Sequence, residues 1–302
     1  MADQIDPQQR QVPNIPPADQ RLKAIIDSDC KNEIDDQWAI ALALLAPERF
    51  AIEGFVAANF DNDWGGPTGI EASAREIERI LEKAGMAGRW PVLQGSHPMQ
   101  YRAEPTLSEG VDFIVERARA ATPEEPLWVI GLGAATNMAS AYLLAPDIAD
   151  RVVAFWHLRT RWPEQCWNFN VFGDPRAARL LFASPLAFVL FDTGTHLTCP
   201  LEESAQRVEP HGDLGAYLHQ YRHTNAHWSN PDKGFFDLGD IAALLAPELA
   251  TWEEVDCPRV DQDLSYRFEN KLGRILRCGD IDRDGTFDLL YDRLATHFPA
   301  RT

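Results

Sequence analysis

The residues with the clearest chemical potential are five acidic side chains near the start of the chain. Asp27, Asp29, Glu33, Asp35 and Asp36 lie within ten positions, directly after a short apolar run. Carboxylates this close repel one another unless a cation or bound protons neutralise them. Hard oxygen donors prefer Ca²⁺ or Mg²⁺ to Zn²⁺. The cluster therefore indicates a site for a hard divalent cation.

A purely structural interpretation of the same residues is that they begin a helix. Asp and Glu are favourable in the first turn of a helix, where they interact with the helix dipole. Position favours the functional interpretation, because Asp27 and Asp29 follow the predicted strand 22–26 directly. In doubly wound sheets, ligands bind outside the carboxyl ends of the strands. We therefore expect the acidic residues to form a binding site.

The elements that would position these carboxylates alternate between strands and helices. Apolar runs predict strands at 22–26, 50–58, 90–95, 126–133, 152–158 and 186–192. Periodic or buried patterns predict helices at 34–46, 68–86, 107–121, 136–145 and 174–183. This alternation is typical of the α/β class, with an open, mostly parallel, doubly wound sheet and helices on both faces. The sequence after Leu197 indicates a mostly helical C-terminal part.

One domain is predicted over residues 21–302, because no repeat or second linker interrupts the pattern. Residues 1–20 contain four prolines and five glutamines and few apolar side chains, which predicts a flexible N-terminal tail. The five cysteines are scattered and form no Cys-x-x-Cys pair, as in reduced proteins. With no signal-peptide pattern at the start, we expect a cytoplasmic protein.

Net charge narrows the classes of partner. The chain has 46 acidic and 28 basic residues and a formal net charge of −18. Such a field repels phosphate backbones and anionic membrane surfaces, so we expect neither nucleic acid nor membrane as a partner. No apolar run approaches the ~20 residues of a membrane-spanning helix. Composition therefore leaves an acidic globular protein of a size typical of an enzyme.

Five motifs in order carry a resemblance to a known family. DSDCKNEIDDQWAIALAL resembles the amino-terminal signature of the inosine–uridine preferring nucleoside hydrolases, Asp-x-Asp followed by an Asp-Asp pair that opens a helix. The other segments that resemble the family are WPVLQGSHPM, GLGAATNMASAYLLAPDIADRV, NFNVFGDPRAARLLF and DLGDIAALLAPE. Each motif alone is weak, but together they span residues 22–250, and the chain is identified as a divergent member.

The resemblance implies a Ca²⁺-dependent N-glycosidase that hydrolyses ribonucleosides to free base and ribose. Carried over residue by residue, it makes Asp29, Asp36, the backbone carbonyl of Thr136 and Asp240 the metal ligands. Asp29 would also act as general base on a metal-bound water, whose pKa the cation lowers. Asp27 would support these ligands from behind.

The resemblance also implies which residues bind the sugar. Asp35 would hold the ribose hydroxyls, Asn62 would match a sugar-binding Asn, and Asn168 and Asn170 would lie at the 5′ side. N-glycosidic cleavage passes through an oxocarbenium-like transition state, as in other glycosidases. Carboxylates near the ring stabilise the developing positive charge.

Three departures from the family pattern concern the same site. Five residues separate Asp29 from Asp35, where the common pattern has three. Asn168 replaces a glutamate, which removes one carboxylate from the sugar side. Gly239 replaces a histidine, and HLRTRW replaces a Gly-Gly-Asn segment, so the usual acid for the leaving base is missing.

A histidine series near the C-terminal motif has two interpretations. His219, His223 and His227 are spaced four apart and would share one face of a helix. They could supply a leaving-group acid or a base-binding residue, or form a half-exposed stripe without a role. Zinc binding is the least favoured interpretation, because no nearby carboxylate or cysteine completes an obvious ligand set. Trp228 beside His227 could stack on a nucleobase or simply pack in the core.

Two other enzyme or binding classes match less of the sequence. DSDC after a strand resembles the start of a haloacid-dehalogenase phosphatase, but that class has no place for the Asp-Asp pair. The run Asp280, Asp282, Asp284, Gly285 begins like a calcium-binding EF-hand loop, but its twelfth position is Tyr291. We expect a polar turn and a C-terminal helix there.

The main alternative keeps the fold and the Ca²⁺ site but changes the chemistry. The replacements at Asn168 and Gly239 are compatible with an unusual N-glycoside substrate or a non-catalytic ligand-binding role. The sequence leaves the base preference open. It leaves the oligomeric state open as well; members of the family are often homo-oligomers (dimer or tetramer), which is an analogy only.

Overall fold

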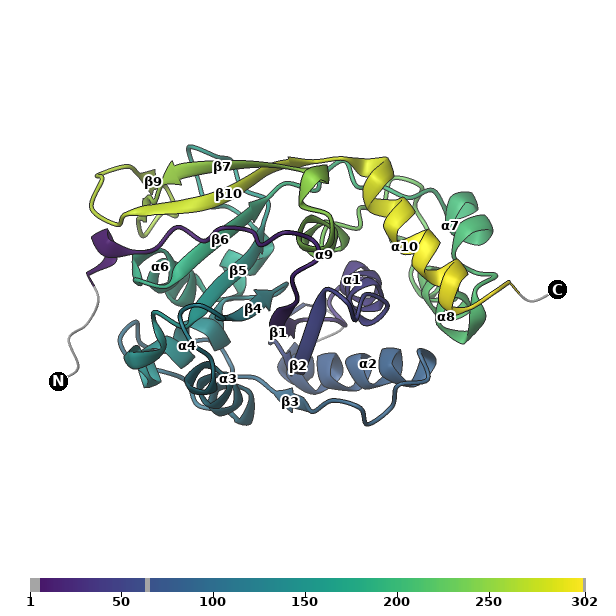
Figure 1. Cartoon of the computed structure of the whole chain (residues 1–302), viewed down its shortest axis with the longest axis horizontal. Helices are drawn as coiled ribbons and strands as arrows, with labels where there is room; N and C mark the ends of the chain where they lie inside the picture. The colour runs from purple at the N-terminus through teal and green to yellow at the C-terminus, as the bar shows by residue number, and fades with distance from the viewer. Residues whose placement is uncertain (1–5, 63–65, 301–302) are drawn as a thin grey trace.

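A central sheet of eight strands organises the part of the chain that this computed structural model describes, residues 6–62 and 66–300. The strand order is β3-β2-β1-β4-β5-β6-β10-β7 (Figure 1). The strands are β1 (Leu22–Ser28), β2 (Phe50–Ala57), β3 (Val92–Gln94), β4 (Leu127–Gly131), β5 (Val152–Leu158), β6 (Ala187–Asp192), β7 (Ala250–Asp256) and β10 (Arg274–Ile281). Every neighbouring pair is parallel except β10 and β7. The predicted open, mostly parallel sheet is confirmed.

Helices cover both faces of this sheet. Alternate residues of a strand point to opposite faces, so Ala24 and Ile26 of β1 belong to one apolar core and Ile25 belongs to the other. The helices on the first face are α1 (Asp35–Leu44), α2 (Gly69–Lys83), α8 (Gly212–Tyr221), α9 (Leu238–Leu245) and α10 (Arg283–His297). Those on the second face are α3 (Glu109–Ala120), α4 (Thr136–Leu144) and α6 (Pro175–Ala183). The remaining helical pieces are α5 (Phe169–Gly173), α7 (Leu201–Arg207), η1 (Pro7–Gln9), η2 (Gly66–Thr68), η3 (Pro146–Ile148), η4 (Arg222–Thr224) and η5 (Pro247–Leu249).

Helix α1 is buried along its whole length, which fixes the residues at its start. All ten of its side chains are buried, including Trp38 at 0% exposure. The Trp38 ring packs on Phe235, just before α9, with ring centroids 4.1 Å apart. A helix that is apolar on every side has no solvent face and stays between its neighbours. The first turn of α1, which carries Asp35 and Asp36, is therefore held in a fixed position.

The C-terminal part contains strands as well as the expected helices. Sequence analysis missed β7 and β10, and also the short pair β8 (Arg259–Val260) and β9 (Tyr266–Arg267). Strand β7 lies at the sheet edge and most of its side chains are exposed, so it lacks the continuous apolar run of a central strand. The segment that resembles an EF-hand joins β10 to α10, where Asp282 Oδ1 caps the helix by accepting from Gly285 N. The predicted C-terminal helix is present.

The described part of the proposed N-terminal tail lies against the domain. The guanidinium of Arg10 is buried and donates to Cys257 Sγ at 2.9 Å and to Phe182 O at 2.7 Å. The Arg49 side chain donates to Pro17 O at 2.6 Å and to Pro16 O at 2.9 Å. These contacts hold residues 10–17 near the amino ends of the strands, and residues 1–5 lie outside the described residues.

Among the described helices, none combines the length and the apolar composition that crossing a membrane requires.

Candidate active site

Five buried aspartates gather near the carboxyl end of β1. They are Asp29 after β1, Asp35 and Asp36 in the first turn of α1, and Asp237 and Asp240 at the start of α9, and we call them the acid cluster. Each of these residues is between 0% and 4% exposed. The chain winds outward from β1 to β3 and then returns to β4, so β1 and β4 flank the switch point of the sheet. Open α/β sheets bind ligands in the crevice at this point.

Burial and mutual repulsion raise the pKa of several acids in the cluster. Burial and the neighbouring charge of Asp35 raise the pKa of Asp36 to about 7. Burial raises the pKa of Asp29 and of Asp237 well above the usual range, and nearby carboxylates add to both shifts. The pKa of Asp240 rises to about 6, because burial outweighs the opposing effect of a neighbouring imidazole. The site therefore favours a cation that would neutralise these carboxylates.

The neighbouring imidazole belongs to His157, the penultimate residue of β5, which sequence analysis did not select. Its Nδ1 lies 2.6 Å from Asp240 Oδ2 and 3.4 Å from Asp237 Oδ1. Burial lowers the pKa of His157, but the charge and hydrogen bond of Asp240 outweigh burial and raise it overall. His157 therefore holds one oxygen of Asp240 in place.

The sequence contains signals for His157 and for Asp237, which sequence analysis also missed. His157 is a polar residue at the carboxyl end of an otherwise apolar strand, where ligand-binding residues gather. Asp237 precedes Asp240 by three residues, so both lie on the same side of the first turn of α9. Its spacing could have identified it beside the predicted ligand.

Two carboxylate oxygens in the cluster are free to bind a cation. Among the described residues, Asp29 Oδ2 and Asp240 Oδ1 are buried without a hydrogen-bond partner. A buried acceptor without a partner is costly, because it has lost its water and gained no hydrogen bond. Donor atoms of His157, Asp237 and Asp240 lie within 4.8 Å of one another, and so do those of Asp35, Asp36 and Asp237. The residues present therefore fit a divalent cation.

Polar neighbours behind the cluster hold its side chains. Ser28 Oγ donates to Asp36 Oδ1 at 2.5 Å, and the backbone N–H of Phe236 donates to Asp35 Oδ2 at 3.2 Å. Asn137 Nδ2 donates to Asp27 Oδ1 at 2.8 Å, and burial raises the pKa of Asp27 to about 7.

Gly133, in the loop between β4 and α4, brings the backbone close to the cluster. A Cβ at this position would lie 3.1 Å from Asp29 Cβ and 3.0 Å from Ala58 Cβ. These distances are tighter than ordinary carbon contacts, so a larger side chain would push the loop away from Asp29. The glycine therefore lets the segment leading to Thr136 run beside β1.

Thr136 begins α4, and its side chain contacts Asp174 rather than the acid cluster. Thr136 Oγ1 donates to Asp174 Oδ2 at 2.8 Å, and Asp174 Oδ1 caps α6 by accepting from Arg176 N and Ala177 N. This pairing fixes the first turn of α4. The resemblance implies a ligand role for the backbone carbonyl of Thr136. These side-chain contacts do not test that role, so it stays a proposal.

The predicted sugar-binding asparagines take part in hydrogen bonds that shape the site. Asn170 is buried, and its Nδ2 donates to Leu132 O at 2.6 Å and to His157 O at 3.1 Å. Asn168 caps α5, with its side-chain oxygen accepting from the backbone N–H of Asn170 at 2.8 Å. Asn170 therefore ties together the chain segments at the ends of β4 and β5.

Asn62, His227 and Trp228 lie in loops outside the acid cluster. Asn62 Nδ2 donates to Asn32 Oδ1 at 2.7 Å, which ties it to the loop after Asp29. The His227 side chain is exposed, whereas Trp228 is buried and stacked on Tyr221, with centroids 5.3 Å apart.

A cavity of about 420 Å³ opens at the carboxyl side of the sheet. Asn59 follows β2, His97 follows β3, and Phe169 and Phe172 come from α5 to line it with exposed aromatic rings. Asn59 directly follows Ala58, which Gly133 brings close to Asp29. This cavity therefore opens on the same side of the sheet as the acid cluster, although none of its lining residues belongs to that cluster.

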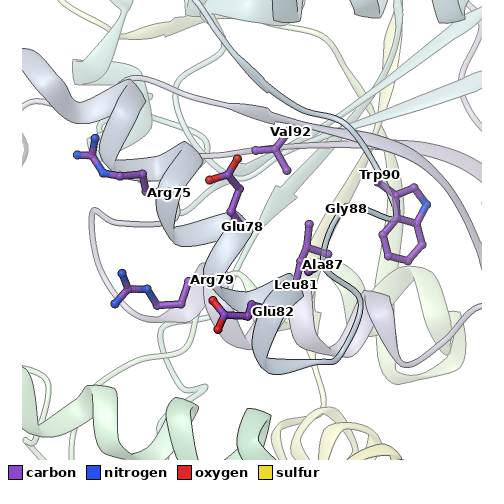
Figure 2. Close-up of a pocket in the computed structure, with 9 residues that line it drawn as sticks. All are labelled: Arg75, Glu78, Arg79, Leu81, Glu82, Ala87, Gly88, Trp90 and Val92. Atoms are coloured by element: carbon purple, nitrogen blue, oxygen red, sulfur yellow. The ribbon is translucent and has the colours of Figure 1, made fainter.

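A second hollow of about 540 Å³ lies on a different part of the surface. Figure 2 shows its lining, which comes from α2 and from the loop that leads into β3 and includes Trp90. The residues before β3 lie at the amino end of that strand, opposite the edge where the acid cluster gathers. Position therefore separates this hollow from the candidate active site.

Comparisons with known proteins agree with the fold and the motifs. A family model described as inosine-uridine preferring nucleoside hydrolase matches residues 24–268. The pyrimidine-specific ribonucleoside hydrolase RihA of Enterobacter sp. (strain 638) is 24% identical over 314 residues, covering 88% of this chain and 96% of that relative. RihA of Escherichia coli O127:H6 is 27% identical with the same coverage.

Solved structures give the same fold at low sequence identity. A plant nucleoside hydrolase, PpNRh1, matches with a TM-score of 0.71 and 20% identity, covering 91% of this chain and 99% of that chain. A purine-preferring ribonucleoside hydrolase from Gardnerella vaginalis matches with a TM-score of 0.71 and 19% identity, covering 91% and 98%.

Proposed function

This chain belongs to the inosine-uridine preferring nucleoside hydrolase family and is a nucleoside N-ribohydrolase, and we propose that its acid cluster binds Ca²⁺ and carries out the reaction. The observation that carries the proposal is the pair of buried, unpartnered oxygens, Asp29 Oδ2 and Asp240 Oδ1, within a group of five aspartates. Carboxylate oxygens are the donors that Ca²⁺ prefers. We propose Asp29, Asp36, Asp240 and the carbonyl of Thr136 as its ligands.

Asp29 is the residue that we propose as general base. Its buried position raises its pKa, which makes it a better proton acceptor when ionised. When bound, the cation would supply Lewis acidity to a water and to the sugar hydroxyls. The Asp29 carboxylate would take the proton from the attacking water, while Asp27, held by Asn137, would stabilise the cluster without binding the metal.

Asp35 and the surrounding carboxylates act on the sugar. We propose that Asp35 accepts hydrogen bonds from ribose hydroxyls through the oxygen that does not face Phe236 N. Negative side chains near the ring stabilise the positive charge that develops as the glycosidic bond breaks. The other residues that we propose to bind the sugar are Asn62, Asn168 and Asn170. Those that we propose to bind the base are His227 and Trp228.

A substrate other than an ordinary ribonucleoside is the second candidate. Asn168 supports it, because its side-chain oxygen caps α5 and it brings no negative charge to the sugar side. The site would then act on another N-glycoside, or bind a ligand without cleaving it.

Sugar release from a nucleoside panel tests the proposal. The RihA relatives are named pyrimidine-specific, so uridine and cytidine stand first in the panel, followed by inosine, adenosine and guanosine. We expect free ribose from at least one of them in the presence of Ca²⁺. Stoichiometric Ca²⁺ binding without release from any member would overturn ordinary nucleoside hydrolysis in favour of the second candidate.

A further inference from the structure

We propose that His219 and His223, together with Glu209, form a second metal site that binds a Zn²⁺-like transition-metal ion. These residues lie on α8, on η4 and in the turn after α7, near α10 at one end of the molecule (Figure 1). None belongs to the acid cluster, and the proposal is independent of the nucleoside hydrolase reaction.

The separation of the two imidazoles suits one shared ion. His219 Nε2 and His223 Nε2 lie 3.5 Å apart, with the ring planes at 79° to each other. Two nitrogens bound to one tetrahedral Zn²⁺ at ~2.0–2.1 Å are separated by roughly 3.4 Å. The pair therefore needs little movement to bind one ion.

The hydrogen bonds of His219 leave its Nε2 lone pair available. Ser204 Oγ lies 3.1 Å from Leu201 O and 2.7 Å from His219 Nδ1. When its single hydrogen points to Leu201 O, Oγ accepts from Nδ1–H of His219, and the neutral ring then has its lone pair on Nε2. A metal-binding histidine is held in this way, with its other nitrogen donating to an oxygen.

Glu209 supplies the third donor, which the sequence spacing did not reveal. Its Oε2 lies 3.4 Å from His219 Nε2. The donor atoms of Glu209, His219 and His223 do not all lie within 4.8 Å of one another, so the Glu209 carboxylate, whose side chain is 42% exposed, has to move toward His223 to complete the ligand set. Two nitrogens and one carboxylate oxygen suit a transition metal better than Ca²⁺, which prefers oxygen ligands alone. His223 is exposed, so the ion is accessible from solvent.

Zn²⁺ titration of the full chain in excess Ca²⁺ tests this site, because Ca²⁺ occupies oxygen-rich sites first. The variants are His223→Ala, which removes one proposed ligand, and His227→Ala, a matched control with an exposed side chain on the same histidine series. We expect calorimetry to show a Zn²⁺ site in the wild type that His223→Ala weakens at least about tenfold, because one of three donors is lost. His227→Ala should leave the site unchanged, and Glu209→Gln should weaken it.

Co²⁺ provides a second readout at the same residues. Co²⁺ bound by imidazole nitrogen should give visible absorption in the wild type and in His227→Ala, and lose most of it in His223→Ala. Identical Zn²⁺ isotherms for the wild type and His223→Ala would overturn the proposal. Equal losses in His223→Ala and His227→Ala would also overturn it, because the binding would then be non-specific. Melting curves recorded in chelator confirm that each variant is folded.

Discussion

Asp29 and Asp240 face the same problem at the residue scale: each has a buried oxygen with no hydrogen-bond partner among the described residues. His157 satisfies the other oxygen of Asp240, and the raised pKa values show how poorly the remaining charge is compensated. A bound cation, or a proton on the carboxyl group, would compensate such an oxygen. The metal-free site therefore carries a free-energy cost that a bound cation would reduce.

Asp29→Asn separates the catalytic role of this carboxyl from its place in the fold. We expect kcat on the best nucleoside to fall by about 10²–10⁴-fold, since an amide cannot take the proton of water. The metal-free variant should melt no lower than the wild type, because the substitution removes a repelled charge. Asp292→Asn, at an exposed position of α10, is the control, and an equal loss of kcat in both variants would contradict a base at Asp29.

The pH dependence of metal-free stability follows from the raised pKa values of the buried acids, those of Asp29 and Asp237 included. Three of these groups set the lower part of the pH range: the pKa values of Asp27 and Asp36 rise to about 7 and that of Asp240 to about 6, from an ordinary value of 3.8. A raised carboxyl pKa means that the folded state binds protons more tightly than the unfolded state. The resulting stability is fully present below pH 3.8 and is lost as the pH rises through 6–7.

Differential melting with the Asp36→Asn variant measures this effect. In chelator, the melting temperature of the wild type should fall between pH 4 and 7 relative to that of Asp36→Asn, which lacks one of the three groups. Excess Ca²⁺ should remove most of the difference by neutralising the cluster. If the melting temperatures of the two proteins change equally with pH across this range in chelator, the predicted contribution of Asp36 is contradicted.

At the scale of elements, α1 is the part that positions the site most directly. Its fully buried surface keeps Asp35 and Asp36 fixed. Trp38, in the same helix, has the largest of these buried side chains. We expect Trp38→Ala to lower the free energy of unfolding by about 3–5 kcal/mol, because it leaves a cavity next to Phe235. Trp167→Ala is the control, since the Trp167 ring is 41% exposed. Denaturant unfolding measures both, and similar losses would argue against α1 as a buried platform.

The elements also show why part of the fold was predictable from sequence. Strands such as β4 and β5 are buried on both faces, so their continuous apolar runs identify them without any partner. Strand β7 owes its conformation to pairing with β10, a contact between distant parts of the sequence, and its charged side chains indicate only exposure. Local pattern alone does not reveal such an edge strand.

Part of the candidate active site was also predictable from the sequence. Asp29, Asp35 and Asp36 form one local motif, and their position after a strand indicates a ligand. His157 and Glu209 acquire their partners only when the sheet and the helical cover assemble, because Asp240 and His219 lie on other elements. Residue types at fixed spacing therefore identify Asp29, Asp35 and Asp36, and tertiary structure adds His157 and Glu209.

At the scale of the whole molecule, the net charge of −18 selects against anionic substrates. A nucleoside is neutral, whereas its 5′-monophosphate carries negative charge that the acid cluster and the general field both repel. We expect kcat/KM for uridine to exceed that for uridine 5′-monophosphate by at least about tenfold, a difference of ~1.4 kcal/mol. The gap should narrow at high salt, which screens the field. Equal values at low salt would contradict this selection.

The most direct test of a working cation site in the acid cluster is to restore Ca²⁺ to chelator-treated protein while recording ribose release. Wild-type protein should be inactive in chelator and regain ribose release as Ca²⁺ is added, with saturation at one ion per chain. Asp240→Asn should need far more Ca²⁺, because it loses a charged ligand with a free buried oxygen. Full ribose release in chelator, or the same Ca²⁺ requirement in Asp240→Asn, would contradict a catalytic cation at these aspartates.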